Sequence, residues 1–377
     1  MTLLILAACA LITAAGGAIA TGRAAISHRA AVSVTATRSP LIVGLADGAA
    51  GYGGASTGPR LDLMRRVSGA RWFRDQFWWY KIEPRPGRFD FRYYDHYMLA
   101  VGRRGLHVVA QLEGSPKWSA SSVWAVPANP AAYARYVAAV LHRYGSGGTF
   151  WKAHPGLAGS AITAVELWNE PYFPNGNAGH YDPARYARLV RASYRAAHRV
   201  DRSAKILLEA DMATHQYGPE TFRWWVDSLY RAMPSLNRYF DGVAMHDYGS
   251  DAVHLTPMRF GQAYRNWDRT RRIEDVRALF VHHHAARKPF WITELGFTTC
   301  HLRNVDCLSP AAQAADLQTM FGYITGRYRS WVRSVFVFRF QDAGHGTGFY
   351  DSYGLVRVNG TPKPALSVFR PFALASG

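Results

Sequence analysis

The sequence predicts an α/β fold consisting of a single (β/α)8 TIM barrel. Short apolar, β-branched runs recur from Leu41 onward, and longer segments with helical periodicity separate them. No Pro-rich linker and no internal repeat divides the 377-residue chain. Eight strands that alternate with helices in one chain are typical of this barrel. A doubly wound sheet is the alternative, but the Gly-rich stretch after Leu45, ADGAAGYGGAST, contains no GxGxxG phosphate turn.

Eight short segments have the composition of buried strands, each following the one before after a helix-length interval. They are Leu41–Leu45, Ala70–Arg74, His107–Leu112, Ile162–Trp168, Lys205–Glu209, Gly242–His246, Phe290–Thr293 and Ser334–Phe340. Longer segments between them repeat their apolar residues at the helical period. The clearest are Tyr93–Arg104, Pro130–Tyr144, Pro183–Val200, Glu220–Ala232, Thr270–His284 and Pro310–Arg327.

The composition fits a globular chain with a large core, because 49% of its residues are hydrophobic and 19% are charged. Aromatic residues reach 14%, which suits a large core or rings that stack on sugars. The formal net charge is +18, yet the basic residues are scattered in pairs such as Arg65-Arg66 and Arg103-Arg104. Nucleic-acid binding favours a basic stripe, so we do not expect it. Attraction to an anionic glycan or an anionic cell surface stays open.

The N-terminal segment predicts export. Residues 1–20 form an apolar run that ends in Ala18-Ile19-Ala20, an A-x-A cleavage signature, without a basic n-region. The run is a signal peptide or an uncleaved membrane anchor. Residues 21–39 read as a flexible leader, and residues 40–377 as the barrel domain. We therefore expect a secreted or cell-surface protein.

Two cysteines remain once the leader is set aside. Cys300 and Cys307 bracket the short stretch CHLRNVDC, and in an oxidising compartment we expect them to form a disulfide. Two free thiols are the alternative. His301 and Asp306 lie within the stretch, but the cluster lacks zinc-ligand spacing, so no metal site is predicted.

Polar side chains follow the predicted strands, at the end where barrel active sites lie. Asn169 and Glu170 follow strand four, and Glu294 follows strand seven. Two carboxyl groups that face each other across a sugar ring can cleave a glycosidic bond, one as the acid and one as the ionised partner. Structural pairing with arginine is the alternative for each glutamate. The further candidates for the site are Arg74, Trp78, Trp118, His246 and Tyr248, with Glu113 and Asp211 as further carboxyls and Glu166 as an internal barrel charge.

WNEP at strand four and TELG at strand seven resemble the catalytic strands of clan A glycoside hydrolases. The run RWFRDQFWWYKIEPRPGRFDFRYYDHYM, then RGLHVVAQLEGSPKW, and the closing GLVRVNGTPKPALSVF resemble family 39 and its relatives over roughly residues 41–370.

The resemblance implies a role for each matching residue. Glu170 would be the general acid/base and Glu294 the nucleophile. Asn169 would bind the sugar 2-hydroxyl, Arg74 and Tyr248 would orient Glu294, and His246 would line the same side. Retention of anomeric configuration is also implied, with the two carboxyl groups about 5–5.5 Å apart.

Strand eight departs from that pattern. Relatives often carry a tryptophan there, whereas this chain reads VFVFRFQD, with Phe336, Phe338 and Phe340. The departure concerns the substrate more than the chemistry.

The sequence therefore predicts a retaining glycoside hydrolase that needs no cofactor and acts on a carbohydrate substrate. A non-catalytic glycan-binding barrel is the main alternative, and a basic surface-binding protein is the third. The sugar, the linkage, endo or exo action and the oligomeric state stay open.

Overall fold

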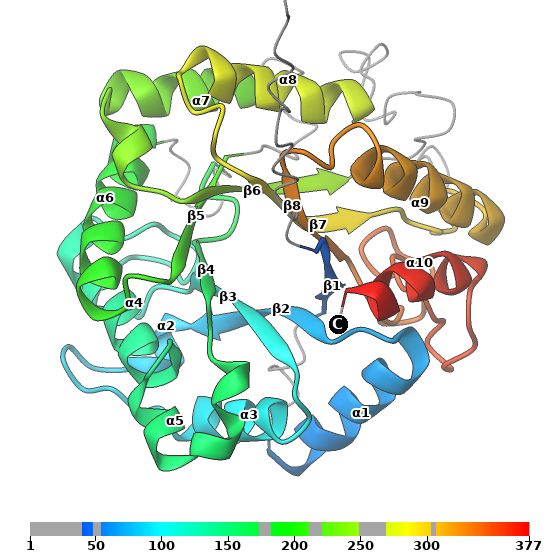
Figure 1. Cartoon of the computed structure of the whole chain (residues 1–377), viewed down its shortest axis with the longest axis horizontal. Coiled ribbons are helices and arrows are strands. Elements are labelled where there is room, and N and C mark those ends of the chain that lie inside the picture. Colours follow the sequence, from blue (N-terminus) through cyan, green and yellow to red (C-terminus); the bar gives the residue numbers. More distant parts are fainter. Residues whose placement is uncertain are drawn as a thin grey trace, which may run out of the picture. The chain divides into compact units, whose positions relative to one another are not determined.

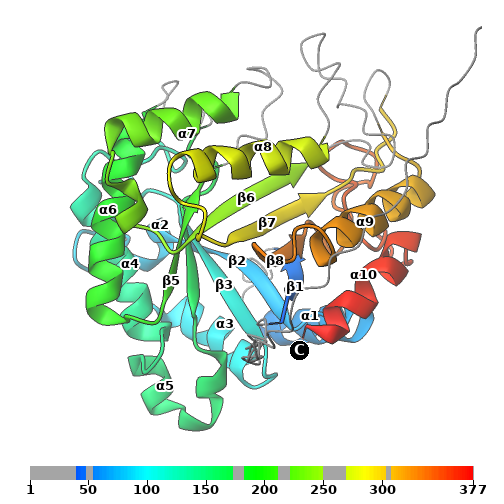
Figure 2. The same ribbon diagram turned by 45° about the horizontal axis from the view of Figure 1, so that its top comes forward.

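The computed structural model describes residues 40–47, 54–172, 182–210, 221–248, 269–302 and 307–376. Within them, eight parallel strands close into a barrel in the order β1 to β8, with the helices outside (Figures 1 and 2). This confirms the predicted (β/α)8 barrel. The predicted signal peptide or anchor and the leader, residues 1–39, lie outside the described part of the chain. Among the helices of that part, none has the length and apolar character to cross a membrane.

The strands agree with the predicted segments, with shifts at their ends. They are β1 Ile42–Ala46, β2 Trp72–Trp78, β3 His107–Glu113, β4 Ala164–Leu167, β5 Lys205–Glu209, β6 Gly242–Tyr248, β7 Phe290–Gly296 and β8 Val332–Val337. The predicted end of strand two at Arg74 is wrong, since β2 continues to Trp78. The Arg74 side chain turns into the barrel, where Glu166 and Glu294 from other strands accept its hydrogen bonds.

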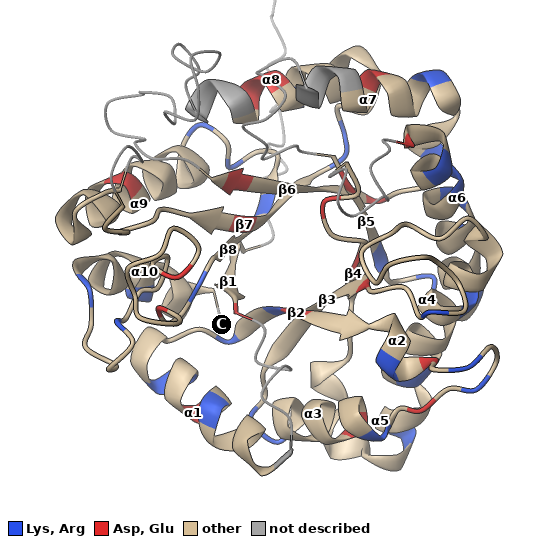
Figure 3. Ribbon diagram, turned by 180° about the vertical axis from the view of Figure 1, so that it is seen from behind, with Lys and Arg blue, Asp and Glu red and all other residues tan. Residues whose placement is uncertain are grey.

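The helices between the strands form the outer layer. They are α1 Thr57–Ser68, α2 Trp79–Ile82, α3 Arg92–Gly102, α4 Pro130–Tyr144, α5 Thr149–Ala153, α6 Pro183–Val200, α7 Thr221–Ala232, α8 Arg269–His282, α9 Pro310–Thr325 and α10 Pro364–Ala375. Helices α1 and α10 were not among the clearest sequence patterns. Lys and Arg are spread over several outer helices among the described residues (Figure 3).

Three helices begin where the sequence predicts, because a capping residue precedes a proline. Asn129 accepts a hydrogen bond from the backbone N–H of Ala131 at 3.0 Å, ahead of α4. Asp182 caps α6 by accepting from the N–H of Arg185 at 2.7 Å. Ser309 caps α9 in the same way. Proline at the first helical position lacks only an N–H that has no intrahelical partner.

The barrel interior contains an apolar layer. Its buried residues are Ile42, Ala46, Val109, Ala164, Leu207, Ala244, Trp291 and Phe336. Gly44 makes room for this layer, because a Cβ at that position would lie 2.7 Å from the Phe336 ring and 2.4 Å from the Trp72 carbonyl oxygen. Two residues further along a strand, the side chain points to the same side. The polar layer described below therefore lies directly above the apolar one.

Two contacts outside the strands lie at opposite ends of the barrel. Cys300 and Cys307 form the predicted disulfide, with Cα atoms 4.9 Å apart. At the other end of the barrel, the Ser376 hydroxyl after α10 accepts a hydrogen bond of 2.8 Å from the backbone N–H of Val43 in β1. The end of the chain thus lies close to the start of β1 (Figure 1).

Candidate active site

Arg74 lies at the centre of the polar layer. Its Nε and Nη2 donate to the two carboxyl oxygens of Glu166 at 2.6 and 2.9 Å. Nη1 donates to Glu294 at 2.5 Å, and Nη2 also donates to the Asn169 side-chain oxygen at 3.0 Å. A planar guanidinium has five N–H donors in a fixed fork, so it can bind one carboxylate through two bonds and still reach further acceptors, whereas an ammonium has only three donors at one nitrogen. One side chain of β2 therefore connects β4, the loop after it and β7.

Glu294 lies in β7 opposite His246 of β6, at a point where the strand register shifts between Met245 and His246. Such irregularities re-aim side chains and are frequent next to active sites. The Tyr248 hydroxyl donates to the Glu294 oxygen that Arg74 does not contact. Burial and the adjacent Glu294 raise the pKa of Tyr248 well above its usual range, so the phenol keeps its proton and acts as a donor.

Glu170 approaches the same histidine from the other side. One of its carboxyl oxygens lies 2.8 Å from Nδ1 of His246, while Nε2 of that ring lies 3.7 Å from Glu294. The backbone just after β4 is left-handed, with φ of 76° at Trp168 and 44° at Glu170. A residue with a Cβ rarely adopts this conformation, and such strain is concentrated at functional sites.

Exposure separates two carboxyl groups from the rest of the cluster. The side chains of Glu170 and Glu294 are 20% and 12% exposed. Those of Glu166, Glu209 and His246 are fully buried. Within this set, only Glu170 and Glu294 can therefore touch a bound molecule directly. The buried groups influence these two carboxyl groups through charge and hydrogen bonds.

The charges of the buried groups follow from their partners. Burial disfavours a charge on both Glu166 and Arg74, but their mutual attraction outweighs it and lowers the pKa of Glu166 while raising that of Arg74. Glu113, the last residue of β3, is raised to a pKa of about 8, mainly by burial. Burial also raises the pKa of Glu209 well above its usual range. Glu113 therefore carries a proton at neutral pH, and burial favours the protonated form of Glu209.

The aromatic candidates lie around the carboxyl ends of the first strands. Trp78 ends β2 beside Glu113, and its ring centroid is 5.7 Å from that of Trp124. The Trp118 ring packs edge-on against Trp79, with centroids 5.3 Å apart, and its indole N–H donates to the Glu83 carbonyl. Trp118 therefore contributes to packing around α2. Phe338, after β8, is partly exposed and lies edge-on to Tyr248 at 5.7 Å.

One group among the described residues has the composition of a metal site, namely Glu166, Glu209 and His246. The Arg74 guanidinium already occupies both oxygens of Glu166 and lies 3.1 Å from Nε2 of His246. A cation there would meet that positive charge and compete for the same oxygens. We therefore assign no metal to this group.

The structure brings together most of the residues that the sequence predicted. Arg74, Asn169, Glu170, His246, Tyr248 and Glu294 form one contact network, and Glu166 is its internal charge. Asp211 lies outside the described residues. Glu209 was not recognised as part of the site, although it lies two residues beyond the inward-facing Leu207 on the same strand. The catalytic and binding roles of the predicted site residues stay predictions.

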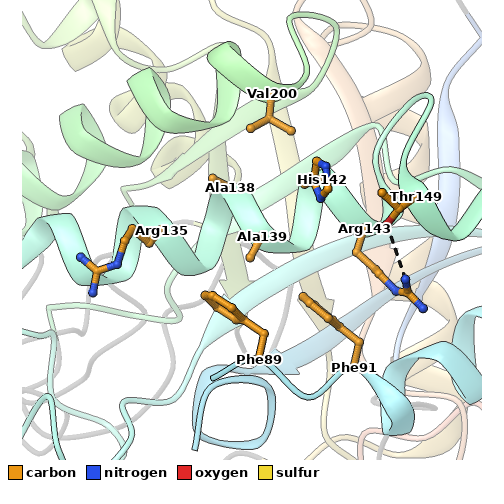
Figure 4. Close-up of a pocket in the computed structure, with 9 residues that line it drawn as sticks. All are labelled: Phe89, Phe91, Arg135, Ala138, Ala139, His142, Arg143, Thr149 and Val200. Carbon is orange, nitrogen blue, oxygen red and sulfur yellow. Dashed lines mark hydrogen bonds between the residues drawn. The ribbon is translucent and has the colours of Figure 1, made fainter. Parts of the chain in front are cut away.

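Two surface hollows lie elsewhere, along α4. The larger, about 520 Å³, is lined by Phe89 and Phe91 and by the helix residues Arg135, His142 and Arg143, among others (Figure 4). The second, about 440 Å³, lies between α4 and α6. Neither is lined by a carboxyl group, so neither offers the acid pair found at the strand ends.

Comparison with known proteins supports the fold. No family profile and no curated protein sequence matches the chain. Solved structures do match. A family 39 glycoside hydrolase from the gut symbiont Bacteroides cellulosilyticus WH2 matches with a TM-score of 0.63 and 16% identity over 89% of this chain and 64% of that one.

Two more matches come from other glycoside hydrolases. A monomeric β-xylosidase from Caulobacter crescentus CB15 has a TM-score of 0.61 and 16% identity, over 88% of this chain and 67% of that chain. Xylanase 10B from Thermotoga petrophila RKU-1 has a TM-score of 0.58 and 12% identity, over 88% and 94%. This chain spans about two thirds of the length of the family 39 structures. The protein is thus similar in fold to family 39 and other clan A (β/α)8 glycoside hydrolases.

Proposed function

We propose that the protein is a retaining glycoside hydrolase. The observation that carries the proposal is that Glu170 and Glu294 are partly exposed and contact one buried ring, that of His246, from its two sides. Two carboxyl groups with such access are the minimum equipment for glycosidic bond cleavage. The fold likeness to xylosidases and a xylanase agrees with this chemistry.

In the first step, Glu170 donates its proton to the glycosidic oxygen while a carboxylate oxygen of Glu294 attacks the anomeric carbon. The bond from that carbon to the leaving oxygen breaks, and a covalent glycosyl ester forms on Glu294. Arg74 and Tyr248 each donate to one oxygen of Glu294, so the carboxylate is held in one orientation before attack.

In the second step, Glu170 removes a proton from water, and the water oxygen attacks the anomeric carbon. The ester bond to Glu294 breaks, and the sugar leaves with its original configuration. Asn169 supports both steps. Its side-chain oxygen accepts from Arg74, which leaves the amide N–H2 group to donate to a sugar hydroxyl. A contact to the 2-hydroxyl that strengthens in the transition state would lower the barrier.

The substrate is a carbohydrate, and its sugar stays open. Relatives often carry a tryptophan on strand eight. Phe338, just after β8, lies against Tyr248, so we propose it as the aromatic floor beneath the sugar. The charge of +18 favours an anionic glycan over a neutral one. We also propose export, since the Cys300–Cys307 disulfide suits an oxidising compartment. N-terminal sequencing of protein recovered outside the cells tests this and shows whether the leader is cleaved.

The test is a screen of the purified protein against aryl glycosides and polysaccharides, with Glu294→Gln as the control. We expect turnover that this substitution abolishes while folding, followed by circular dichroism, is unchanged. Retained activity in Glu294→Gln would remove Glu294 from the nucleophile role. Binding of glycans by both proteins without any turnover would instead favour a non-catalytic glycan-binding barrel.

The acid role of Glu170 has a separate test. An aryl leaving group that departs without protonation needs no general acid. We therefore expect Glu170→Ala to spare substrates with very good leaving groups and to disable those with poor ones. Equal loss on both kinds of substrate would contradict this role.

A further inference from the structure

Glu209, the last residue of β5, is a buried carboxyl group that the proposed mechanism does not use. Its side chain is fully buried, and neither carboxyl oxygen accepts a hydrogen bond from any described residue. An isolated buried carboxylate is so costly that the group holds its proton instead. Burial raises the pKa of Glu209 well above its usual range, in agreement with this geometry.

Glu209 faces two buried groups, Glu166 and His246. One Glu209 oxygen lies 3.4 Å from Nε2 of the ring, and the opposite ring nitrogen, Nδ1, lies 2.8 Å from Glu170. The imidazole therefore lies between a fully buried carboxyl group and the carboxyl group proposed as the acid/base. The group that faces one ring nitrogen decides which nitrogen of a neutral histidine carries the proton.

Two placements of the proton between Glu209 and His246 are available. With the proton on Glu209, the carboxyl O–H faces the lone pair of Nε2, and the ring proton resides on Nδ1. With the proton transferred to Nε2, the ring is doubly protonated and Glu209 is a carboxylate. In both placements the Nδ1–H of His246 donates to Glu170.

We propose that Glu209 is a positioning residue that holds the His246 proton on Nδ1, so that the ring donates to Glu170. The opposite tautomer, with its proton on Nε2 alone, would turn a lone pair toward Glu170. That tautomer would leave an ionised Glu170 facing a lone pair after each proton transfer. The consequence for turnover rests on the proposed function, whereas the tautomer itself does not.

Two other groups face Nε2 of the ring. Nη2 of Arg74 lies 3.1 Å from Nε2 and has no lone pair, so it cannot accept from an Nε2–H. Glu166, 3.4 Å from Nε2, is the competing acceptor toward which an Nε2–H would point, although both of its oxygens also accept from Arg74. Burial opposes a charge on His246, and the surrounding carboxyl groups, Glu209 first, outweigh it and raise the pKa of the ring. The titratable groups that face Glu209 or the ring are Arg74, Glu166, Glu170, Tyr186, Tyr248 and Glu294.

The tautomer can be measured without a substrate. Nitrogen-15 NMR of the histidine-labelled protein reports which ring nitrogen carries the proton, and the signal that disappears in His246→Gln identifies the ring. We expect Nδ1 to be protonated in the wild type and in Glu209→Gln, whose amide N–H can face Nε2 in place of the carboxyl O–H. In Glu209→Leu no such donor exists, so we expect proton occupancy to move toward Nε2.

Glu83→Gln is the matched control. Glu83 is also fully buried, but it accepts hydrogen bonds from the Trp79 indole and the Gly87 backbone, outside the network of Arg74 and His246. We expect no change in the His246 signals of this variant. A wild-type ring with its proton on Nε2 alone would overturn the inference, and this measurement does not depend on whether Glu209→Leu folds. A wild-type tautomer in folded Glu209→Leu would overturn it as well.

Turnover gives the second readout. We expect kcat/KM of Glu209→Gln within about threefold of the wild type, and a loss of about 10- to 100-fold in Glu209→Leu, the range found when partners that orient metal-bound histidines are removed. Equal losses in both variants would indicate packing alone and contradict the inference. A wild-type protein that shows the expected tautomer and no turnover would count against the proposed function only.

Discussion

Arg74 in β2 and Glu294 in β7 form a 2.5 Å ion pair across the inside of the barrel. The two strands are not neighbours, because β1 and β8 lie between them. The same guanidinium also contacts Glu166 in β4. A single side chain therefore couples the closure of the barrel to the orientation of the proposed nucleophile, so its replacement should affect both stability and activity.

Arg74→Met should lower the free energy of unfolding by about 3–5 kcal/mol, because it leaves Glu166 as a buried charge without its partner. Arg74→Lys keeps the charge but cannot contact Glu166, Asn169 and Glu294 together, so we expect an intermediate loss. Urea unfolding measures both. Arg92→Met is the control, since this side chain is 90% exposed and its pair with Asp90 should contribute little. Equal effects at Arg74 and Arg92 would contradict the central position of Arg74.

Glu113 predicts a pH dependence of stability. Its pKa is about 8 in the folded protein against an ordinary value of 4.5, so the folded state holds a proton that the unfolded state releases. The contribution of Glu113 is therefore complete below about pH 4.5 and is lost as the pH rises toward 8. Relative to the wild type, Glu113→Gln should gain stability through this window, by up to about 1.4 kcal/mol per pH unit.

Urea unfolding at several pH values between 5 and 8 measures the difference between the two proteins. Asp62→Asn is the control, because the Asp62 carboxyl is half exposed and its pKa is lowered, first by its hydrogen bond to Arg104. That carboxyl is ionised in both states throughout the window, so its difference from the wild type should not change with pH. A constant difference for Glu113→Gln would show that Glu113 is already ionised.

Gly44→Ala should destabilise the barrel from within. The new methyl group would overlap the Phe336 ring and the Trp72 carbonyl oxygen, and overpacking of this kind costs about 1–3 kcal/mol. Gly322→Ala in α9 is the matched substitution, because nothing beyond its chain neighbours and the backbone of its own helix lies within 4 Å of its Cβ position. There we expect a gain of about 0.5–1 kcal/mol from helix propensity. Thermal unfolding of both proteins should give shifts of opposite sign, and shifts of the same sign would contradict the packing argument.

Replacement of Cys300 and Cys307 by serine should cost about 2–3 kcal/mol, since the bond closes a short loop in the unfolded chain. The wild type under reducing conditions should then unfold like the double variant. Titration of unfolded, unreduced protein that lacks the leader with Cys9 should find no free thiol. If reductant left the wild-type unfolding curve unchanged, the disulfide would have no role in stability.

The sequence predicted the helix starts well because each depends on neighbouring residues. Asn129-Pro130, Asp182-Pro183 and Ser309-Pro310 carry a cap and a compatible first residue. The end of β2 was predicted wrongly for the opposite reason. Arg74 and Asp75 look like the polar end of a strand, yet they are buried inside one, because Glu166 and Tyr97 supply their partners. Those partners are remote in sequence, so a local sequence pattern cannot predict them.

The exposed part of the candidate site was easier to predict than its buried support. Glu170 and Glu294 interrupt apolar runs and stand out. Glu209 ends its strand in the same way, but no motif surrounds it, and a glutamate in that place reads as an ordinary loop residue. Its alternation with Leu207 was the available signal. Alternation places a residue on a face, and only the closed barrel brings that face against His246.

The hydrogen bond from Val43 to Ser376 places both ends of the described barrel beneath the strands, on the side away from Glu170 and Glu294. A support attached at Pro40 or at Ser376 would therefore hold the barrel by the amino end of β1. The carboxyl ends of the strands would face the solution. Immobilised enzyme or array-based binding assays can use either terminus as the handle, with the pair of glutamates left open to large polysaccharides.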